Sequence, residues 1–269
     1  MSNRLDKLLA ILEKMDSVLV AFSGGVDSSL LLKAAKLSVK GRVIAVTSVS
    51  PTMPCEDAVF AKQIALSIDV EHLLIKTDEL KDSRFTSNPL TRCYYCKKGI
   101  FDKLKDYAKT QGISFILDGS NVDDMGDYRP GRKAALEAGV RSPLIEAGLR
   151  KEDIRAISRK LGLPTWNKPA SPCLASRIPY GHEITEQALK QVEKAEGLLR
   201  LLEFKEFRVR HYGELARIEI LPSDFSRIVV DEVREKIVSF FKLCGYRQIA
   251  LDLEGFRSGR LNETLNRLV

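Results

Sequence analysis

The run of residues with the clearest chemical potential is Ser23-Gly-Gly-Val-Asp-Ser-Ser29. Its two glycines permit backbone conformations that turn successive N–H groups toward an anion, and its serines add hydroxyl donors. The residues 30–36 that follow predict a helix, so these donors would lie at a helix N-terminus, where the dipole favours phosphate. The run matches neither G-x-x-x-x-G-K-[ST] nor G-x-G-x-x-G. We therefore predict a phosphate loop of another kind, formed by Ser23, Gly24, Gly25, Asp27, Ser28 and Ser29.

Asp27 is the residue of this run that needs a separate explanation. A carboxylate repels phosphate unless it holds a cation or fixes the loop, so its presence suggests a nucleotide bridged by Mg²⁺. The alternative interpretation is that Ser-Gly-Gly is a flexible turn and that Asp27 and Ser28 form an ordinary helix N-cap. The position of the run directly after a buried strand favours the phosphate loop.

Thr47 and Ser48 lie at the end of the next apolar strand. Ligands of open α/β sheets bind at the carboxyl ends of the strands, so we expect these two residues to contact the ribose or the adenine of a nucleotide. The alternative is that they merely end a strand.

Cysteine spacing indicates a second kind of chemistry. Cys93-Tyr-Tyr-Cys96 is a CxxC pair at the start of a predicted helix, where the dipole stabilises thiolate, and Cys173 lies in a proline-interrupted segment. Three soft thiolates suit an iron–sulfur cluster or zinc, although zinc ordinarily takes a fourth ligand. The pattern alone leaves open a [4Fe-4S] cluster, a structural zinc site, a redox pair and inert thiols. We expect Cys55 and Cys244 to lie outside the site.

Strands and helices that alternate along the first part of the chain must position these residues. Apolar periodicity predicts helices near residues 5–12, 30–36, 56–68, 98–109, 132–138 and 152–161. Short apolar runs predict strands at 17–22, 43–48, 70–76 and 114–118. Strands separated by helices imply an α/β fold with a parallel sheet covered on both faces. Residues 78–91 and 164–181 break the pattern, and we interpret both segments as functional loops.

The remainder of the chain predicts a smaller α+β domain. Its pattern is helix, strand, strand, helix, strand, at residues 186–202, 207–211, 215–221, 229–243 and 248–253. We therefore expect a nucleotide-binding domain over residues 1–170. A second domain over residues 171–269 would carry the cysteine segment and serve substrate binding or oligomerisation.

Composition limits the class of protein. The chain has 269 residues, 44% of them apolar and 29% charged, which excludes disordered and fibrous proteins. Lys and Arg exceed Asp and Glu by seven (43 against 36), which suits an anionic substrate as well as nucleic acid. No run approaches the roughly 18 apolar residues of a membrane-spanning helix. Because the chain opens on an amphipathic pattern and its five cysteines show no disulfide framework, we expect a cytoplasmic protein.

Ser23–Ser29 resembles the pyrophosphate loop, SGGxDS, of the ATP pyrophosphatase (PP-loop) superfamily, whose sheet is of the adenine nucleotide alpha hydrolase-like kind. Further segments narrow the resemblance to the LarE family of ATP-dependent sulfur transferases. These segments are residues 45–51, 118–124, 127–131, 171–181 and 255–259. Together they span nearly the whole chain.

This resemblance implies a reaction. MgATP is cleaved between its α- and β-phosphates, and AMP is transferred to a carboxylate of pyridinium-3,5-biscarboxylic acid mononucleotide. Sulfur then displaces AMP, because the adenylate is a leaving group that a free carboxylate lacks. The product is the bisthiocarboxylic acid precursor of the nickel-pincer nucleotide cofactor.

The resemblance also bears on the source of the sulfur. In one branch of the family the position of Cys173 is a sacrificial cysteine that becomes dehydroalanine, and that branch lacks the CxxC pair. In the other branch three cysteines hold a [4Fe-4S] cluster, whose open iron carries extra sulfide. With Cys93, Cys96 and Cys173 all present, the chain resembles the cluster branch. Loss of sulfur from Cys173 is the alternative.

The phosphate of such a substrate needs cationic side chains, and arginine offers bidentate, permanently charged contacts. The candidates are Arg177, Arg208, Arg210 and Arg257. Asp124 and Arg129 follow a predicted strand near the expected position of the activated substrate, and Ser176 could donate to it. Surface arginines, an Asx turn at Asp124 and a serine that satisfies its own loop are the alternatives. Asp27, Cys173, Ser176 and Arg177 are the expected catalytic residues.

Two other functions remain open at this point. Related pyrophosphate-loop enzymes thiolate tRNA, but the basic residues here are interspersed with acids and form no stripe with aromatic residues, so nucleic acid is not the expected partner. A carrier that binds ATP without turnover would not need Asp27 and the serines. The expected partners are a small nucleotide substrate, sulfide or another sulfur donor and, from the family resemblance, further copies of the chain.

Overall fold

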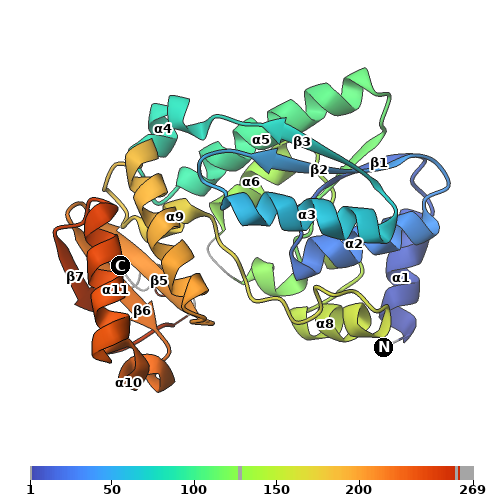
Figure 1. Ribbon diagram of the computed structural model, residues 1–269. Coiled ribbons are helices and arrows are strands. Elements are labelled where there is room, and N and C mark those ends of the chain that lie inside the picture. Colours follow the sequence, from blue (N-terminus) through green and yellow to red (C-terminus); the bar gives the residue numbers. More distant parts are fainter. Residues whose placement is uncertain (1, 127–128, 258–259, 261–269) are drawn as a thin grey trace. The chain divides into compact units, whose positions relative to one another are not determined.

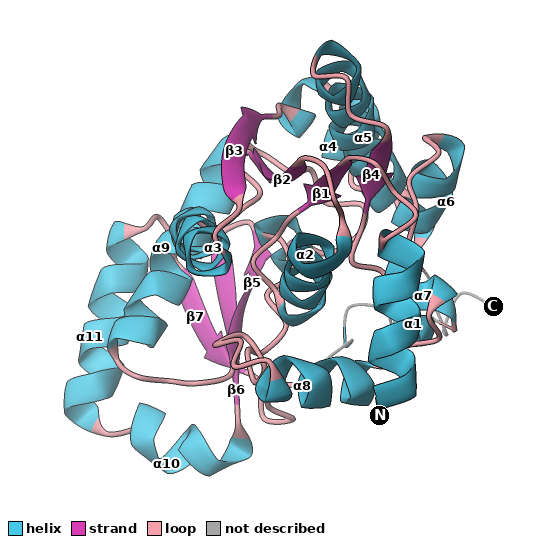
Figure 2. Ribbon diagram, turned by 90° about the vertical axis from the view of Figure 1, so that its right-hand side faces the viewer, coloured by secondary structure: helices cyan, strands magenta, loops and turns pink. Residues whose placement is uncertain are grey.

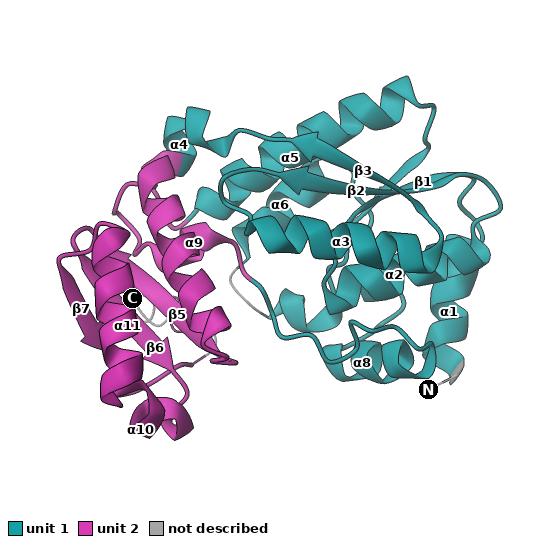
Figure 3. Ribbon diagram, viewed as in Figure 1, with its two compact units in different colours: residues 1–85, 91–171 teal, residues 86–90, 172–269 magenta. Residues whose placement is uncertain are grey.

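The computed structural model describes residues 2–126, 129–257 and 260 (Figure 1). The chain forms two compact units (Figure 3). The first unit comprises residues 1–85 and 91–171, and the second comprises residues 86–90 and 172–269. Residues 86–90 belong to the second unit because the buried amide of Asn88 donates to the carbonyl groups of Pro179 (2.7 Å) and His182 (2.9 Å).

A four-stranded parallel sheet with the order β3-β2-β1-β4 forms the centre of the first unit. The strands are β1 (Val18–Ala21), β2 (Val43–Val49), β3 (Glu71–Lys76) and β4 (Phe115–Leu117). Val18 is the register partner of Val43 on one side and of Phe115 on the other. Because β1 is buried on both faces, it is a continuous apolar run without polar alternation.

Helices cover both faces of this sheet (Figure 2). The helices up to residue 160 are α1 (Ser2–Leu12), α2 (Val26–Ser38), α3 (Cys55–Ile68), α4 (Ser83–Thr86), α5 (Arg92–Thr110), α6 (Pro130–Glu137), α7 (Pro143–Glu146) and α8 (Lys151–Lys160), of which α2 and α3 lie on one face and α5 and α6 on the other. Two 3₁₀ turns, η1 (Glu79–Lys81) and η2 (Val122–Met125), lie in the loops. Val18 and Val20 of β1 pack in the hydrophobic cluster that includes α1, α2 and α3, whereas Leu19 packs with α5 and α6.

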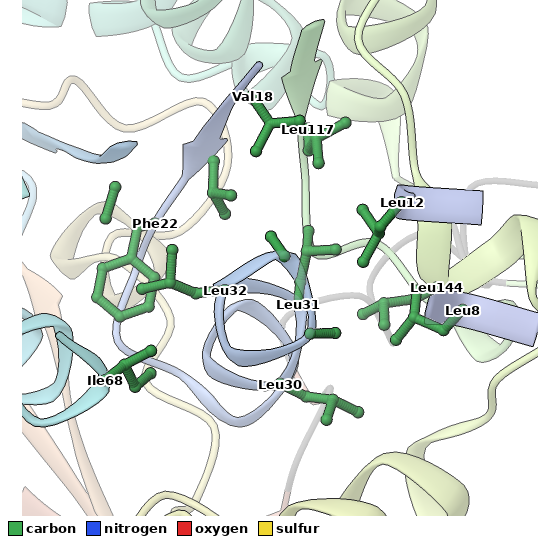
Figure 4. Packing of buried hydrophobic residues seen from close by; sticks show 14 of the residues in the cluster. Leu8, Leu12, Val18, Phe22, Leu30, Leu31, Leu32, Ile68, Leu117 and Leu144 are labelled. Atoms are coloured by element: carbon green, nitrogen blue, oxygen red, sulfur yellow. The ribbon is translucent and has the colours of Figure 1, made fainter. Parts of the chain in front are cut away.

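Helix α2, which carries the phosphate loop at its N-terminus, is deeply buried. Its consecutive Leu30, Leu31 and Leu32 have no exposed surface and belong to one hydrophobic cluster with Val18, Leu117 and the α1 leucines, and Leu32 lies beside Phe22 (Figure 4). Lys36 and Leu37, near the end of the helix, are exposed, so the burial is concentrated in the part of α2 that follows the loop.

The second unit contains a three-stranded sheet of order β5-β6-β7, with β5 (Phe207–Tyr212), β6 (Leu215–Ile220) and β7 (Gln248–Leu251). β5 and β6 are antiparallel, whereas β6 and β7 are parallel. The helical elements are η3 (Leu174–Arg177), α9 (Glu186–Leu201), η4 (Pro222–Asp224), α10 (Phe225–Ile228) and α11 (Asp231–Leu243). Val209, Ile218 and Phe241 are among the residues of its separate core.

The predicted fold class is confirmed: an α/β unit with a parallel sheet accompanies a smaller α+β part. Some boundaries differ. Helix α5 begins at Arg92 instead of near Lys98, which places the CxxC pair within the helix, and residues 78–91 contain η1 and α4. Helix α11 begins at Asp231, so Val229 is 58% exposed and does not belong to its buried face. Among the described helices, none combines the length and apolar character needed to cross a membrane.

Candidate active site

The phosphate loop connects the end of β1 to the N-terminus of α2. Gly24 has a φ of +67°, and a methyl group at this position would come within 2.9 Å of the Cα of Ala61 in α3, so glycine is required twice over. The hydroxyls of Ser23 and Ser28 lie 3.1 Å apart, and the Gly25 N–H donates to Ser23 Oγ (3.3 Å). Ser29 Oγ is fully buried and has no hydrogen-bond partner among the described residues. The predicted loop residues thus form one compact group of donors.

Asp27 has two partners that come from distant segments. Lys151 Nζ, at the start of α8, lies 2.5 Å from Asp27 Oδ2, and Asn121 Nδ2 donates to Oδ1 over 3.4 Å. Lys151 itself is held by its backbone N–H, which donates to Asp123 Oδ2 (2.8 Å). A cation therefore neutralises the carboxylate that stands beside the phosphate loop.

The segment after β4 connects the two predicted acidic positions, Asp27 and Asp124. Asn121 is the N-cap of η2, and its backbone N–H donates to Asp124 Oδ2 (2.9 Å) in a capping box. Asp124 Oδ1 also pairs with Arg129 at 2.9 Å. The structure therefore brings Asp27, Asn121, Asp124 and Arg129 into one hydrogen-bonded chain, whereas Asp127 and Tyr128 lie outside the described residues.

Gly119 explains how this segment approaches the phosphate loop so closely. A methyl group at Gly119 would stand 3.0 Å from the backbone nitrogen of Ser28. Asp118, the residue before it, accepts hydrogen bonds from the hydroxyls of Ser120 (2.8 Å) and Ser142 (2.6 Å). These bonds fix the turn that presents Asn121 to Asp27.

At the end of β2, Thr47 is only 2% exposed and its hydroxyl is engaged inside the protein. Thr47 Oγ1 donates to the carbonyl of Phe22 (2.7 Å) and lies 2.8 Å from His72 Nε2. Because the hydroxyl proton goes to Phe22, the Nε2 atom of His72 carries its own proton and donates it to Thr47. Burial, with a smaller contribution from Lys62, lowers the pKa of His72, which favours this neutral form. Ser48, the other predicted nucleotide contact, is half-buried.

The CxxC pair lies on the first two turns of α5, and both cysteines are half-buried. Cys96 Sγ is 3.9 Å from Glu79 Oε1, which also accepts from Thr77 Oγ1 (2.8 Å). Glu79 Oε2 is buried and has no hydrogen-bond partner among the described residues. Thiols at a helix N-terminus are the residue type that binds soft or borderline metals.

Cys173, in the second unit, is exposed, and its segment is held by buried arginines. Arg177 is 3% exposed and makes two hydrogen bonds to Glu196 (2.9 and 2.8 Å). Its remaining nitrogen donates to the carbonyls of Pro172 (2.6 Å) and Cys173 (3.1 Å) and to Ser176 Oγ (3.0 Å). Arg177 thus sets the backbone of the cysteine segment.

Arg210 and Arg208 come from alternate positions of β5. Arg210 is 6% exposed, pairs with the fully buried Glu219 at 2.9 Å and donates to the carbonyl of Ser176 (2.9 Å). Burial, and then the charges of Arg177 and Arg210, lower the pKa of Arg208 to about 10. Arg257 is exposed and donates to Glu254 over 3.2 Å, while Ser258 and Gly259 lie outside the described residues.

Comparisons with known proteins decide the family. No family model matches the chain. An uncharacterized protein of Synechocystis is 42% identical over 267 residues, which are 99% of this chain and 100% of the relative. The pyridinium-3,5-bisthiocarboxylic acid mononucleotide synthase of Lactiplantibacillus plantarum is 41% identical over 264 residues, which are 97% of this chain and 94% of that enzyme. The chain belongs to the LarE family. An uncharacterized protein of Methanocaldococcus jannaschii, 31% identical over 247 residues, covers 91% of this chain and 92% of its own length.

Membership in the LarE family makes the chain an enzyme, since the Lactiplantibacillus relative is a synthase. Several polar residues of this LarE protein that contact the predicted site residues or segments were not among those predicted from the sequence. They are Asp57, His72, Glu79, Asn121, Lys151, Glu196 and Glu219. A buried carboxylate beside an arginine has no spacing signal, because its partner is distant along the chain. Only the Asn121–Asp124 capping box could have been recognised from local spacing.

Within the described parts of this LarE chain, no three His, Cys, Asp or Glu side chains are gathered around one point as they would be around a metal ion. Cys93 and Cys96 belong to the first unit and Cys173 to the second. The three-cysteine cluster therefore stays a prediction from donor chemistry.

Proposed function

We propose that this LarE protein inserts sulfur into pyridinium-3,5-biscarboxylic acid mononucleotide after ATP-dependent adenylylation of its carboxylates. One observation carries the proposal. A serine–glycine phosphate loop with a paired carboxylate and lysine stands at the N-terminus of a buried helix, in a chain 41% identical to a bisthiocarboxylic acid mononucleotide synthase. The product would be the precursor of the nickel-pincer nucleotide.

The phosphate loop is suited to a triphosphate. Helix α2 presents the N–H groups of its first turn, which have no partners within the helix, together with the hydroxyls of Ser23 and Ser28. Donors that are already positioned stabilise charge that develops on the phosphates without further reorganisation. We assign to Ser23, Gly24, Gly25, Ser28 and Ser29 the binding of the β- and γ-phosphates. The nucleoside side of the site is assigned to the end of β2, where Ser48 would be the contact and the buried Thr47, bonded to Phe22, would hold the strand end in place.

Asp27 and Lys151 have complementary roles in this proposal. Their oxygen and nitrogen atoms lie 2.5 Å apart, so each neutralises the other. When MgATP binds, Lys151 would turn to the phosphates and Asp27 would hold Mg²⁺, which would supply charge neutralisation on the leaving pyrophosphate. Asn121 keeps the Asp27 carboxylate oriented through this exchange.

The arginine-rich segment of the second unit is assigned to the substrate. Arg177 and Arg210 hold the carbonyls around Cys173 and Ser176, which presets the conformation of the cysteine segment. Arg208 and Arg257 are the proposed contacts to the substrate phosphate. Asp124 and Arg129 are assigned to the neighbourhood of the activated carboxylate in the first unit.

The sulfur step is assigned to Cys93, Cys96 and Cys173. These thiols would hold a [4Fe-4S] cluster, which supplies an iron with an open position for sulfide. What the protein contributes is the backbone conformation of Cys173, through Arg177, and the buried carboxylate of Glu79 beside Cys96. We further propose sulfide or another sulfur donor as co-substrate, and assembly into a homo-oligomer.

The decisive experiment measures AMP, pyrophosphate and thiocarboxylate in protein purified without oxygen and supplied with MgATP, sulfide and the dicarboxylate mononucleotide. All three products are expected, and Asp27→Ala should lower AMP formation by about 100-fold or more with an unchanged circular dichroism spectrum. Undiminished AMP in Asp27→Ala would contradict its metal-binding role. Absence of AMP in the wild type would indicate a carrier, and salt-dependent retention of tRNA with no turnover of the mononucleotide would indicate tRNA thiolation.

A further inference from the structure

Helix α3 contacts two segments of the first unit that the proposed reaction uses at different steps. One is the phosphate loop, where Gly24 packs so closely on Ala61 that a methyl group would come within 2.9 Å of its Cα. The other is residues 168–171, the segment that leads into Cys173 and includes Lys168 and Ser171. Ile64, Ala65 and Ile68 of the helix pack in the core of the unit.

Asp57 is the residue through which α3 holds the second segment. Asp57 is 9% exposed, and both of its carboxylate oxygens accept hydrogen bonds. Oδ1 accepts from Lys168 Nζ (3.2 Å), and Oδ2 accepts from Ser171 Oγ (2.7 Å). Lys168 Nζ also lies 3.8 Å from the centre of the Phe60 ring. A half-buried ion pair with a cation–π contact is far better ordered than an exposed pair.

Asp57 and Ala61 are one helical turn apart and therefore lie on the same face of α3. Gly24 of the phosphate loop packs against α3 at Ala61. A shift of the helix at Ala61 would therefore also shift Asp57 and the segment that Asp57 holds. Ser171 precedes Cys173 by two residues along the chain. The phosphate loop and residues 168–171 thus share one support, and the second of these leads into the cysteine segment.

We propose that Asp57 is a positioning residue that couples nucleotide binding at the phosphate loop to the conformation of the segment leading into Cys173. This inference rests on the proposed function, because it requires ATP in the loop and a role for Cys173 in sulfur transfer. Coupling has a chemical advantage: an acyl adenylate is open to hydrolysis, so the sulfur-bearing segment must be in place when the adenylate forms. ATP consumption and sulfur insertion then stay in step.

Hydrogen exchange of the full chain, prepared without oxygen, tests the coupling. The nucleotide is an ATP analogue with a methylene bridge between its α- and β-phosphorus atoms, together with Mg²⁺. In the wild type, nucleotide should slow exchange of the amides of residues 168–174 by about fivefold, a moderate allosteric coupling. Asp57→Asn should remove this response while nucleotide still protects residues 24–30.

Asp69→Asn is the matched control. Asp69 caps the other end of α3, pairs with Lys36 at 3.0 Å and has a φ of +61°, which asparagine also accepts. The Asp69→Asn variant removes one negative charge from α3, as Asp57→Asn does, but Asp69 holds neither the phosphate loop nor residues 168–171. Nucleotide should therefore still slow exchange in residues 168–174. Ser171→Ala removes the hydroxyl that donates to Asp57 and should weaken the same response. This variant replaces Asp57→Asn as the test if Asp57→Asn does not fold.

A second readout separates positioning from a general structural role. In Asp57→Asn, the KM for ATP should change by less than about twofold, whereas AMP formed per thiocarboxylate should rise several-fold above the wild-type ratio. A wild-type response in Asp57→Asn, or no response in the wild type despite nucleotide binding measured by calorimetry, would overturn the coupling. Failure of the wild type to bind the analogue at all would overturn the proposed function itself.

Discussion

In the proposed reaction, the carboxylate of Asp27 would change partners when a metal-bound triphosphate enters the phosphate loop. Lys151 is its present partner at 2.5 Å, and this side chain is 38% exposed, so it can reach toward an incoming phosphate. An ammonium group that pairs with a carboxylate in one state and with phosphate in the other keeps the site near neutrality in both. In this proposal, binding of the phosphates depends on Lys151 as well as on the serines of the phosphate loop.

Lys151→Gln should raise the KM for ATP by about tenfold and lower the rate of AMP formation, because one charge-assisted contact to phosphate is lost. Steady-state kinetics with varied ATP gives both values. Lys36→Gln, which breaks an exposed pair with Asp69, is the control and should have little effect. Unaltered ATP kinetics in Lys151→Gln would remove this residue from the phosphate site.

The pKa of His72 yields a prediction on stability. Its folded-state pKa lies below the ordinary value of 6.5 because of burial, so the unfolded chain binds a proton at higher pH than the folded protein does. Neutral His72 therefore makes its full contribution to the free energy of unfolding above pH 6.5. This contribution is lost as the pH falls through the folded pKa, by roughly 1.4 kcal/mol for each unit between the unfolded and the folded pKa. His72→Gln should flatten the fall of the unfolding temperature between pH 7.5 and 5.

Thermal unfolding followed by circular dichroism measures this difference. His211, whose pKa burial also lowers, contributes a fall of the same sign, so the comparison is between slopes of the wild type and the variant. Identical slopes in the wild type and in His72→Gln would show that His72 does not contribute to the fall of the unfolding temperature at low pH.

At the scale of elements, the phosphate loop is held from three sides. Helix α2 is buried in the core, α3 presents Ala61 to Gly24, and the turn after β4 approaches Ser28 at Gly119. A glycine at a contact this close cannot be replaced without moving backbone. The position of the loop thus depends on packing between elements that are distant in sequence.

Gly119→Ala should destabilise the protein by about 1–3 kcal/mol through overpacking and should weaken ATP binding, because the added methyl group would lie 3.0 Å from the Ser28 nitrogen. Gly197→Ala is the control: nothing stands within 4 Å of its added methyl group, and alanine inside α9 should stabilise by about 0.5–1 kcal/mol. Denaturant titration and nucleotide calorimetry report the two effects. Wild-type ATP affinity in Gly119→Ala would show that this contact does not position the loop.

For the molecule as a whole, the proposed sulfur step would need cysteines from both units. Cys93 and Cys96 lie on α5 of the first, and Cys173 lies at the start of η3 in the second. A single substitution in either unit should therefore abolish the metal site, whereas a redox pair or zinc held by α5 alone would not depend on Cys173.

Cys93→Ala should remove iron, acid-labile sulfide and the broad absorbance of a cluster from protein purified without oxygen, and Cys173→Ala should do the same. Metal and sulfide analysis measures both, and zinc or no metal in the wild type would contradict the cluster. Mass spectrometry after turnover should find Cys173 intact. Dehydroalanine at this position would place the chain in the sacrificial branch.

Local sequence determined the elements and the chemical character of the loop. Continuous apolar runs mark β1 and β2, helical periodicity marks α3 and α9, and Ser23–Ser29 has the donors and glycines of a phosphate site. These features depend on neighbours within a few residues, so they can be read along the chain. Tertiary structure alone decided which side chains meet. Lys151 lies 124 positions from Asp27, and Asp57 lies 114 from Ser171. Such pairs leave no trace in periodicity or spacing, because the free energy that brings them together comes from burying apolar faces elsewhere in the core.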